Sequence, residues 1–182
     1  MSLVASAVPT DFLTLDAYFG RIGYDGPREP TAAVLRSIHQ HHVQAIPFEN
    51  LDVLLGRRIN IEPDAIADKL IGQHRGGYCF EQNTLLREML RALGFTVTPL
   101  LARVRWQVPA DDTTGLTHMA LAVEAEGRRW LCDVGFGALV SPIPLSFETD
   151  AEQLTTHEPR RLIARHGRVT HQTKLGDTWH DL

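Results

Sequence analysis

A cysteine, a histidine and an aspartate in this 182-residue sequence have the types and surroundings that nucleophilic catalysis needs. Cys79 follows two glycines in the segment Arg75–Cys79 and opens an apolar helical pattern, so we expect it at the start of a helix. The free N–H groups and partial positive charge there favour a thiolate and could stabilise an oxyanion. Taken alone, a cysteine beside a loop is more often a buried structural residue.

A predicted β-hairpin strengthens the catalytic interpretation. A thiolate nucleophile needs a base, and the base needs an acceptor that orients it. Residues 117–134 alternate in polarity around Glu126-Gly127, a pattern typical of a hairpin. With a two-residue turn, Ala120 pairs with Asp133, and His118 then lies on the face of Asp133. A three-residue turn would place them on opposite faces, so the sequence supports this pair without fixing it.

Asp133 lies in an otherwise apolar run, Trp130 to Gly137. An unpaired carboxylate in such a strand costs on the order of several kcal/mol, which favours a partner for it. The alternative is that Asp133 caps a turn at Gly135. Cys132 alternates to the opposite face, so we expect a small core residue there. The same alternation argues against a zinc site that would combine both cysteines with His118 and Asp133.

The remaining sequence predicts helices before residue 94 and strands after it. Apolar stripes indicate four helices: residues 14–22, a helix capped by Thr31 and ended by Pro47, residues 65–72 and residues 79–93. Residues 95–108 look extended, and a second hairpin is expected around Gly167. We therefore expect an α+β fold with a helical bundle over residues 1–94, carrying the cysteine, and a β-barrel-like domain over residues 95–182, carrying the histidine and aspartate.

Composition excludes several classes of function. The net charge of −4 and the pI of about 6.1 argue against nucleic acid as a partner. We find neither a secretory signal nor a run long enough to span a membrane, and the two cysteines are far apart, so we expect a cytoplasmic protein without a disulfide. His39 and His42 lie one helical turn apart, but no third ligand stands at a suitable spacing, so we expect no metal.

Four segments resemble the signature segments of the arylamine N-acetyltransferases. They are Ile46–Leu51, Arg75–Glu81, Thr117–Met119 and Asp133–Gly137, within a resemblance that runs from about Phe12 to the C-terminus. The resemblance implies a ping-pong transfer of acetyl from acetyl-CoA to an arylamine or arylhydrazine. It also implies a cysteine-protease- or transglutaminase-like core in which Cys79 is acetylated, His118 is its partner and Asp133 orients the histidine.

The resemblance assigns further roles. It implies substrate-binding positions at Phe48, Gly135, Phe136 and Gly137. It also implies that Arg75 and Glu49 form a structural ion pair that holds the cysteine loop. For the two phenylalanines the alternative is core packing, and for the charged pair it is separate solvation.

Members of this family carry a third, α/β lid domain, which we expect to be absent here because the sequence ends at Leu182. Three hypotheses follow: an acetyltransferase, an amide synthase or thiol hydrolase with the same triad, and a truncated remnant with little or no turnover. Small-molecule acetyl-CoA and arylamine are the expected partners, together with self-association through the surface that a lid would cover.

Overall fold

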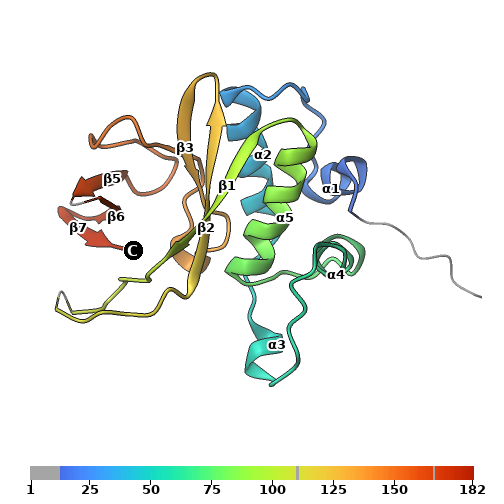
Figure 1. The fold of residues 1–182 in the computed structure, drawn as a ribbon, viewed down its shortest axis with the longest axis horizontal. Helices are drawn as coiled ribbons and strands as arrows, with labels where there is room; N and C mark the ends of the chain where they lie inside the picture. Colours follow the sequence, from blue (N-terminus) through green and yellow to red (C-terminus); the bar gives the residue numbers. More distant parts are fainter. Residues whose placement is uncertain (1–12, 110, 166) are drawn as a thin grey trace, which may run out of the picture.

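The computed structural model describes residues 13–109, 111–165 and 167–182, with helices in the first half and strands in the second (Figure 1). The first twelve residues of the predicted helical domain lie outside this range. The helical elements are α1 (Leu15–Ile22), α2 (Ala32–Ala45), α3 (Leu51–Leu54), α4 (Pro63–Ala67), the π-helix η1 (Asp68–Gly72), α5 (Cys79–Ala92) and the 3-10 helix η2 (Gly137–Leu139). The strands are β1 (Thr96–Ala102), β2 (His118–Ala125), β3 (Arg128–Cys132), β4 (Leu145–Ser146), β5 (Arg160–Arg165), β6 (Arg168–Leu175) and β7 (Thr178–Asp181).

Local capping explains where the predicted helices begin. The Thr14 hydroxyl accepts a hydrogen bond from the backbone N–H of Ala17, at 3.2 Å, and the Thr31 hydroxyl accepts one from Val34 at 3.3 Å. Pro63 occupies the first turn of α4, where its missing N–H costs nothing. The four predicted helices are thus confirmed, while the short exposed α3 was not predicted.

The hairpin between β2 and β3 has the predicted two-residue turn. Glu126 and Gly127 both have positive φ, 52° and 71°, as this turn type requires. The register begins at Ala125 opposite Arg128 and continues to Leu121 opposite Cys132. The predicted register is therefore confirmed, with Asp133 as the first residue beyond the paired part of the strand.

Two predictions about the strands were wrong. The expected barrel-like domain is not a closed barrel in the described ranges: the strands form an antiparallel sheet β1-β2-β3-β4 and a separate sheet β5-β6-β7. The extended stretch expected up to Val108 ends as a strand at Ala102. The reason is that Ala102 pairs with His118, the first residue of β2, so no partner strand remains beyond it.

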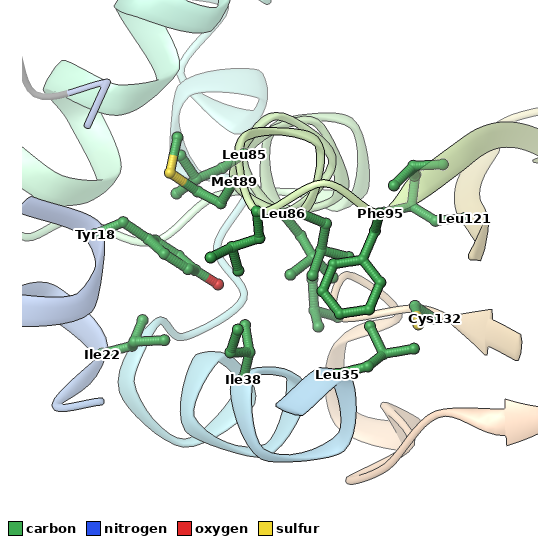
Figure 2. Packing of buried hydrophobic residues seen from close by; sticks show 14 of the residues in the cluster. Tyr18, Ile22, Leu35, Ile38, Leu85, Leu86, Met89, Phe95, Leu121 and Cys132 are labelled. Carbon is green, nitrogen blue, oxygen red and sulfur yellow. The ribbon is translucent and has the colours of Figure 1, made fainter. Parts of the chain in front are cut away.

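One apolar core joins the helices to the first sheet. Side chains of α1, α2 and α5, such as Tyr18, Ile38 and Leu86, pack with Leu121 and Cys132 of the hairpin (Figure 2). On the other side of this sheet, Ile143, Leu145 and Leu162 form a smaller cluster toward the second sheet. The division into two domains near residue 94 stays a prediction, since the main core crosses that boundary.

None of the helices in the described part of the chain combines the length and the apolar run that crossing a membrane requires.

Candidate active site

Cys79 is the first residue of α5, where the helix meets the hairpin. Its side chain is buried, and its sulfur lies 3.8 Å from the backbone carbonyl of Thr117, immediately before His118. Gly135 packs directly on the start of the helix, because a Cβ at this position would lie 2.6 Å from Cys79 Cα. The free N–H groups of the first helical turn therefore lie beside the sulfur, as a nucleophile at a helix start requires.

The loop before Cys79 is held by backbone hydrogen bonds to the segment at Pro47. The Gly77 N–H donates to the Pro47 carbonyl at 3.3 Å, and the Glu49 N–H donates to the Gly77 carbonyl at 3.0 Å. Glycine is required at position 76, since a Cβ there would lie 2.1 Å from the Pro47 oxygen. The close approach of these two segments explains Gly76, whereas a Cβ at Gly77 would lie 2.9 Å from the Glu81 side chain.

Arg75 and Glu49 form an ion pair with a 2.8 Å separation, as the resemblance implies. The structure adds two residues that sequence reasoning missed. Asp52 lies 3.0 Å from Arg75 and 2.9 Å from Lys69, and Lys69 in turn contacts Glu81 at 2.8 Å. Hydrogen bonds from Lys69 and Arg75 hold the pKa of Asp52 well below its usual range. These five residues tie the cysteine loop to α3, η1 and α5.

His118 and Asp133 are both buried and in direct contact, with 2.6 Å between His118 Nε2 and Asp133 Oδ2. The other carboxylate oxygen, Oδ1, accepts the backbone N–H of Gly135 at 3.0 Å and a side-chain N–H of Asn83 at 3.1 Å. Asp133 therefore contacts the histidine with one oxygen and the turn at Gly135 with the other, so the contacts expected from both alternatives are present together.

The charges of this pair support each other. Burial alone would lower the pKa of His118, but hydrogen bonds to Asp133 and Cys79 outweigh it and raise that pKa to about 10. Burial alone would raise the pKa of Asp133, yet the hydrogen bond from His118 brings a net shift below its usual value. The imidazolium–carboxylate form is thus favoured near neutral pH.

The two nitrogens of the His118 ring face two different groups. Nε2 is bonded to Asp133, which leaves Nδ1 for the Cys79 sulfur that helps to raise the pKa of the imidazole. Such an arrangement can hold a proton between thiol and imidazole and return it to a leaving group. The structure thus brings the three predicted catalytic residues together in the order nucleophile, base and orienting carboxylate.

The predicted substrate positions surround this triad. The Phe136 ring meets the His118 ring edge-on, with centroids 5.2 Å apart. The exposed Phe48 ring lies beside Gly137, where a Cβ would be 3.6 Å from the ring. Gly137 has a positive φ of 80°, which a glycine adopts without strain. Neither aromatic ring belongs to the main core, so core packing does not explain either position, and the prediction that both rings line the substrate site is favoured.

Cys132 is fully buried in the core, and burial raises the pKa of its thiol far above the usual value. His42 is bonded to Tyr18 and Gln82 at 2.8 and 2.7 Å. Over the described ranges, no group of three or more histidine, cysteine, aspartate or glutamate side chains is arranged to hold a metal ion.

Asn83 was not singled out from the sequence. It donates to the Met119 carbonyl at 2.8 Å and to Asp133, and it accepts the Val134 N–H at 3.1 Å. The available signal was its position four residues after Cys79, on the same face of α5.

Comparison with known proteins identifies the family and the fold. The N-acetyltransferase family model matches residues 31–182. An arylamine N-acetyltransferase of Mycobacterium tuberculosis is 45% identical over 174 residues, covering 93% of this chain and 62% of the relative. The structure of the Salmonella typhimurium arylamine N-acetyltransferase superposes with a TM-score of 0.89 at 40% identity, covering 95% of this chain and 62% of that one. A Mycobacterium marinum arylamine N-acetyltransferase structure in complex with CoA gives a TM-score of 0.88 at 41% identity, covering 92% and 63%.

The fold and the family match define an acetyltransferase class of protein. The chain belongs to the N-acetyltransferase family, whose relatives named above are arylamine N-acetyltransferases, and this confirms the resemblance drawn from the four sequence segments. The chain spans about 62% of the length of the relatives it matches.

Proposed function

We propose that this chain carries the acetyl-transfer centre of an arylamine N-acetyltransferase, with Cys79 as nucleophile, His118 as base and Asp133 as orienting carboxylate. The observation that carries the proposal is the contact series from Cys79 through His118 to Asp133 at the start of α5. The family match selects the acyl donor and acceptor, because the triad alone is shared with hydrolases.

The chemistry follows from these contacts in two half-reactions. In the first, the Cys79 thiolate attacks the thioester carbonyl carbon of acetyl-CoA, and N–H groups at the start of α5 stabilise the oxyanion. The bond to the CoA sulfur breaks, and His118 protonates the departing thiolate. In the second, the amine nitrogen attacks the acetyl-cysteine, neutral His118 accepts the amine proton, and the Cys79 thiolate leaves as the amide forms.

The acceptor is an arylamine or arylhydrazine in this proposal. Phe136 and Phe48 present aromatic faces beside His118 and Gly137, where a flat aromatic ring can stack. Gly135 lets the loop after Asp133 approach the start of α5, and Gly137 lets the same loop approach the Phe48 ring, so both glycines would shape the acceptor site through the backbone. The Arg75–Glu49 pair would act by holding the cysteine loop in place.

Intact mass spectrometry tests the proposal directly. The protein is mixed with acetyl-CoA, and we expect the mass of one acetyl group to be gained on Cys79 and lost when an arylamine is added. Cys79→Ala should gain none, whereas Cys132→Ala should behave as the native protein. An adduct that decays equally fast without amine would indicate a hydrolase, and the absence of any adduct on folded protein would indicate an inactive remnant.

Two further expectations stay predictions. Self-association of this chain is tested by sedimentation over a range of concentrations, and a cytoplasmic location by fractionation of cells that express it.

A further inference from the structure

Asn83 lies on the nucleophile helix α5, on the side that contacts β2 and the segment directly after β3. Its side chain bonds the residue after His118, the carboxylate of Asp133 and the residue after Asp133. It is fully buried, and it lies one helical turn below Cys79 on the same face of α5. A side chain in this position links the nucleophile to the base and to the orienting carboxylate in a single network.

The three contacts fix the orientation of the Asn83 amide. The Val134 N–H is a donor and requires the amide oxygen, while the Met119 carbonyl is an acceptor and requires the amide nitrogen. The second hydrogen on that nitrogen then points to Asp133 Oδ1. With Oδ1 engaged by Asn83 and Gly135, Oδ2 is the oxygen that faces His118.

We propose that Asn83 is a positioning residue that sets the separation of Cys79 from His118 and the rotamer of Asp133. The inference rests on the proposed function, because it concerns the same thiol and imidazole. Small displacements of a reacting group can cost about a hundredfold in rate for a shift near 1 Å, so a buried clamp between helix and hairpin acts on chemistry as well as on stability.

The titratable groups near Asp133 determine which changes in rate with pH can be assigned to the Asn83 network. Asp133 is within electrostatic range of His39 on α2, Arg160 on β5 and His171 on β6, besides His118 on β2. Burial lowers the pKa of His39 and of His171 to about 4, so both stay neutral above about pH 5.5. Arg160 stays charged throughout, which leaves the His118–Asp133 pair as the titrating groups that Asn83 contacts.

The first test compares alkylation of Cys79 by iodoacetamide in the native protein and in Asn83→Ser. At about pH 7 we expect the rate to fall at least about tenfold, because a displaced imidazole stabilises the thiolate less well. At about pH 9.5, where an unassisted thiol also ionises, the rate should return to within about threefold of native. An unchanged rate at pH 7, or an equal fall at both pH values, would overturn the proposal.

Two control variants separate positioning from general loosening of the fold. Thr84→Val removes the neighbouring hydroxyl, which lies 3.8 Å from Met119 sulfur, and should keep the native profile. Met89→Ala opens a cavity in the buried face of α5 away from the site, and should lower the melting temperature without moving the pH profile.

Asn83→Asp provides a second test, which remains available if Asn83→Ser fails to fold. When it is protonated, the introduced carboxyl keeps an oxygen for the Val134 N–H and offers its single O–H to either Asp133 or the Met119 carbonyl; when it is ionised, it offers no donor and places a second negative charge beside Asp133. We expect the ratio of variant to native acetylation rate to rise at least about fivefold from pH 7.5 to pH 5.5. A ratio that does not change with pH would count against positioning through Asp133.

The two proposals fail in different ways. If the native protein gains no acetyl group from acetyl-CoA but its alkylation depends on Asn83 as described, the proposed function is wrong and the positioning role stands. If the native protein is acetylated and Asn83→Ser is acetylated and alkylated at native rates, the positioning role is wrong and the proposed function stands.

Discussion

His42 and His118 are both buried and both hydrogen-bonded on each side of the ring, yet their pKa values move in opposite directions. In the helical half, His42 lies between the Tyr18 hydroxyl and the Gln82 amide, and burial lowers its pKa to about 3. At the junction with the hairpin, Asp133 and Cys79 overcome the effect of burial and raise the pKa of His118 to about 10. Burial does not make a histidine reactive; an ionised partner beside a nucleophile does.

The His42 network also has a defined direction. The Gln82 amide nitrogen donates to the carbonyls of Ile46 and Pro47, at 3.3 and 2.9 Å, so its oxygen faces the ring. His42 Nε2 therefore carries the proton, and Nδ1 accepts from Tyr18. This series of hydrogen bonds between uncharged groups ends at the Pro47 carbonyl, which also accepts the Gly77 N–H. It therefore helps to hold the cysteine loop without involving a charged group.

The largest effect should separate the two histidines by reactivity. His118→Gln should slow alkylation of Cys79 at neutral pH by about a hundredfold or more, since a general base of this kind contributes 10² to 10⁴. His42→Gln should leave that rate within about threefold of native while lowering stability by roughly 1–3 kcal/mol, because buried partners lose a hydrogen bond. Equal rate losses in both variants would break the contrast. Mapping the label by mass spectrometry, with unfolding followed in urea, measures both quantities.

The next effect is the dependence of stability on pH, which should have opposite signs. The raised pKa of His118 gives a contribution that is complete below about 6.5 and is lost as the pH rises through about 10. The lowered pKa of His42 gives a contribution to stability that is fully present above about pH 6.5 and is lost as the pH falls toward 3. Each histidine contributes a slope of at most about 1.4 kcal/mol per pH unit.

Urea unfolding of the native protein and the two variants at about pH 4.5, 6.5 and 9.5 measures these slopes. His118→Gln should flatten the alkaline side and His42→Gln the acid side. A flattening of the same side by both variants would show that the two environments are not electrostatically opposite.

A smaller effect on stability and reactivity is expected from a substitution at Gly135, which is tightly packed. Gly135→Ala places a Cβ 2.6 Å from Cys79 Cα and 2.9 Å from the Asn83 amide nitrogen, so α5 and the loop must move apart. We expect a loss of about 1–3 kcal/mol in the free energy of unfolding, together with slower alkylation of Cys79. Native stability and reactivity in this variant would mean that the loop approaches the helix less closely than described.

The smallest effect should be a gain. Gly20 is an exposed residue within α1, and a Cβ there would meet nothing within 4 Å. Gly20→Ala should therefore raise the free energy of unfolding by about 0.5–1 kcal/mol without changing the reactivity of Cys79. A decrease measured by urea unfolding would show that α1 makes a contact at this position.

Sequence reasoning succeeded where local chemistry decides the structure. The positive φ values at Glu126 and Gly127 fix a two-residue turn, and that turn alone sets the face on which His118 lies. The apolar stripe of α5 and the glycines before Cys79 likewise predicted the helix start. The roles of the predicted site residues stay predictions until they are measured.

The features that the sequence did not predict depend on distant partners. Asn83, Lys69 and Asp52 look like ordinary polar residues, and their contacts appear only when α5, η1 and α3 come together. The end of β1 at Ala102 follows from where β2 begins, not from β-propensity at residues 103–108. The split into two sheets likewise depends on pairing between strands that a single sequence does not specify.

The two thiols give this chain its own reporter of opening motions. Cys79 lies at the surface of the core beside the site, whereas Cys132 is fully enclosed between the hairpin and the helices. A reagent that labels Cys79 in the folded state can reach Cys132 only when the shared core opens. The slow labelling phase then measures the free energy or the rate of that opening, depending on whether closing outruns the reagent. Each variant can thus be examined for site reactivity and global opening in one time course.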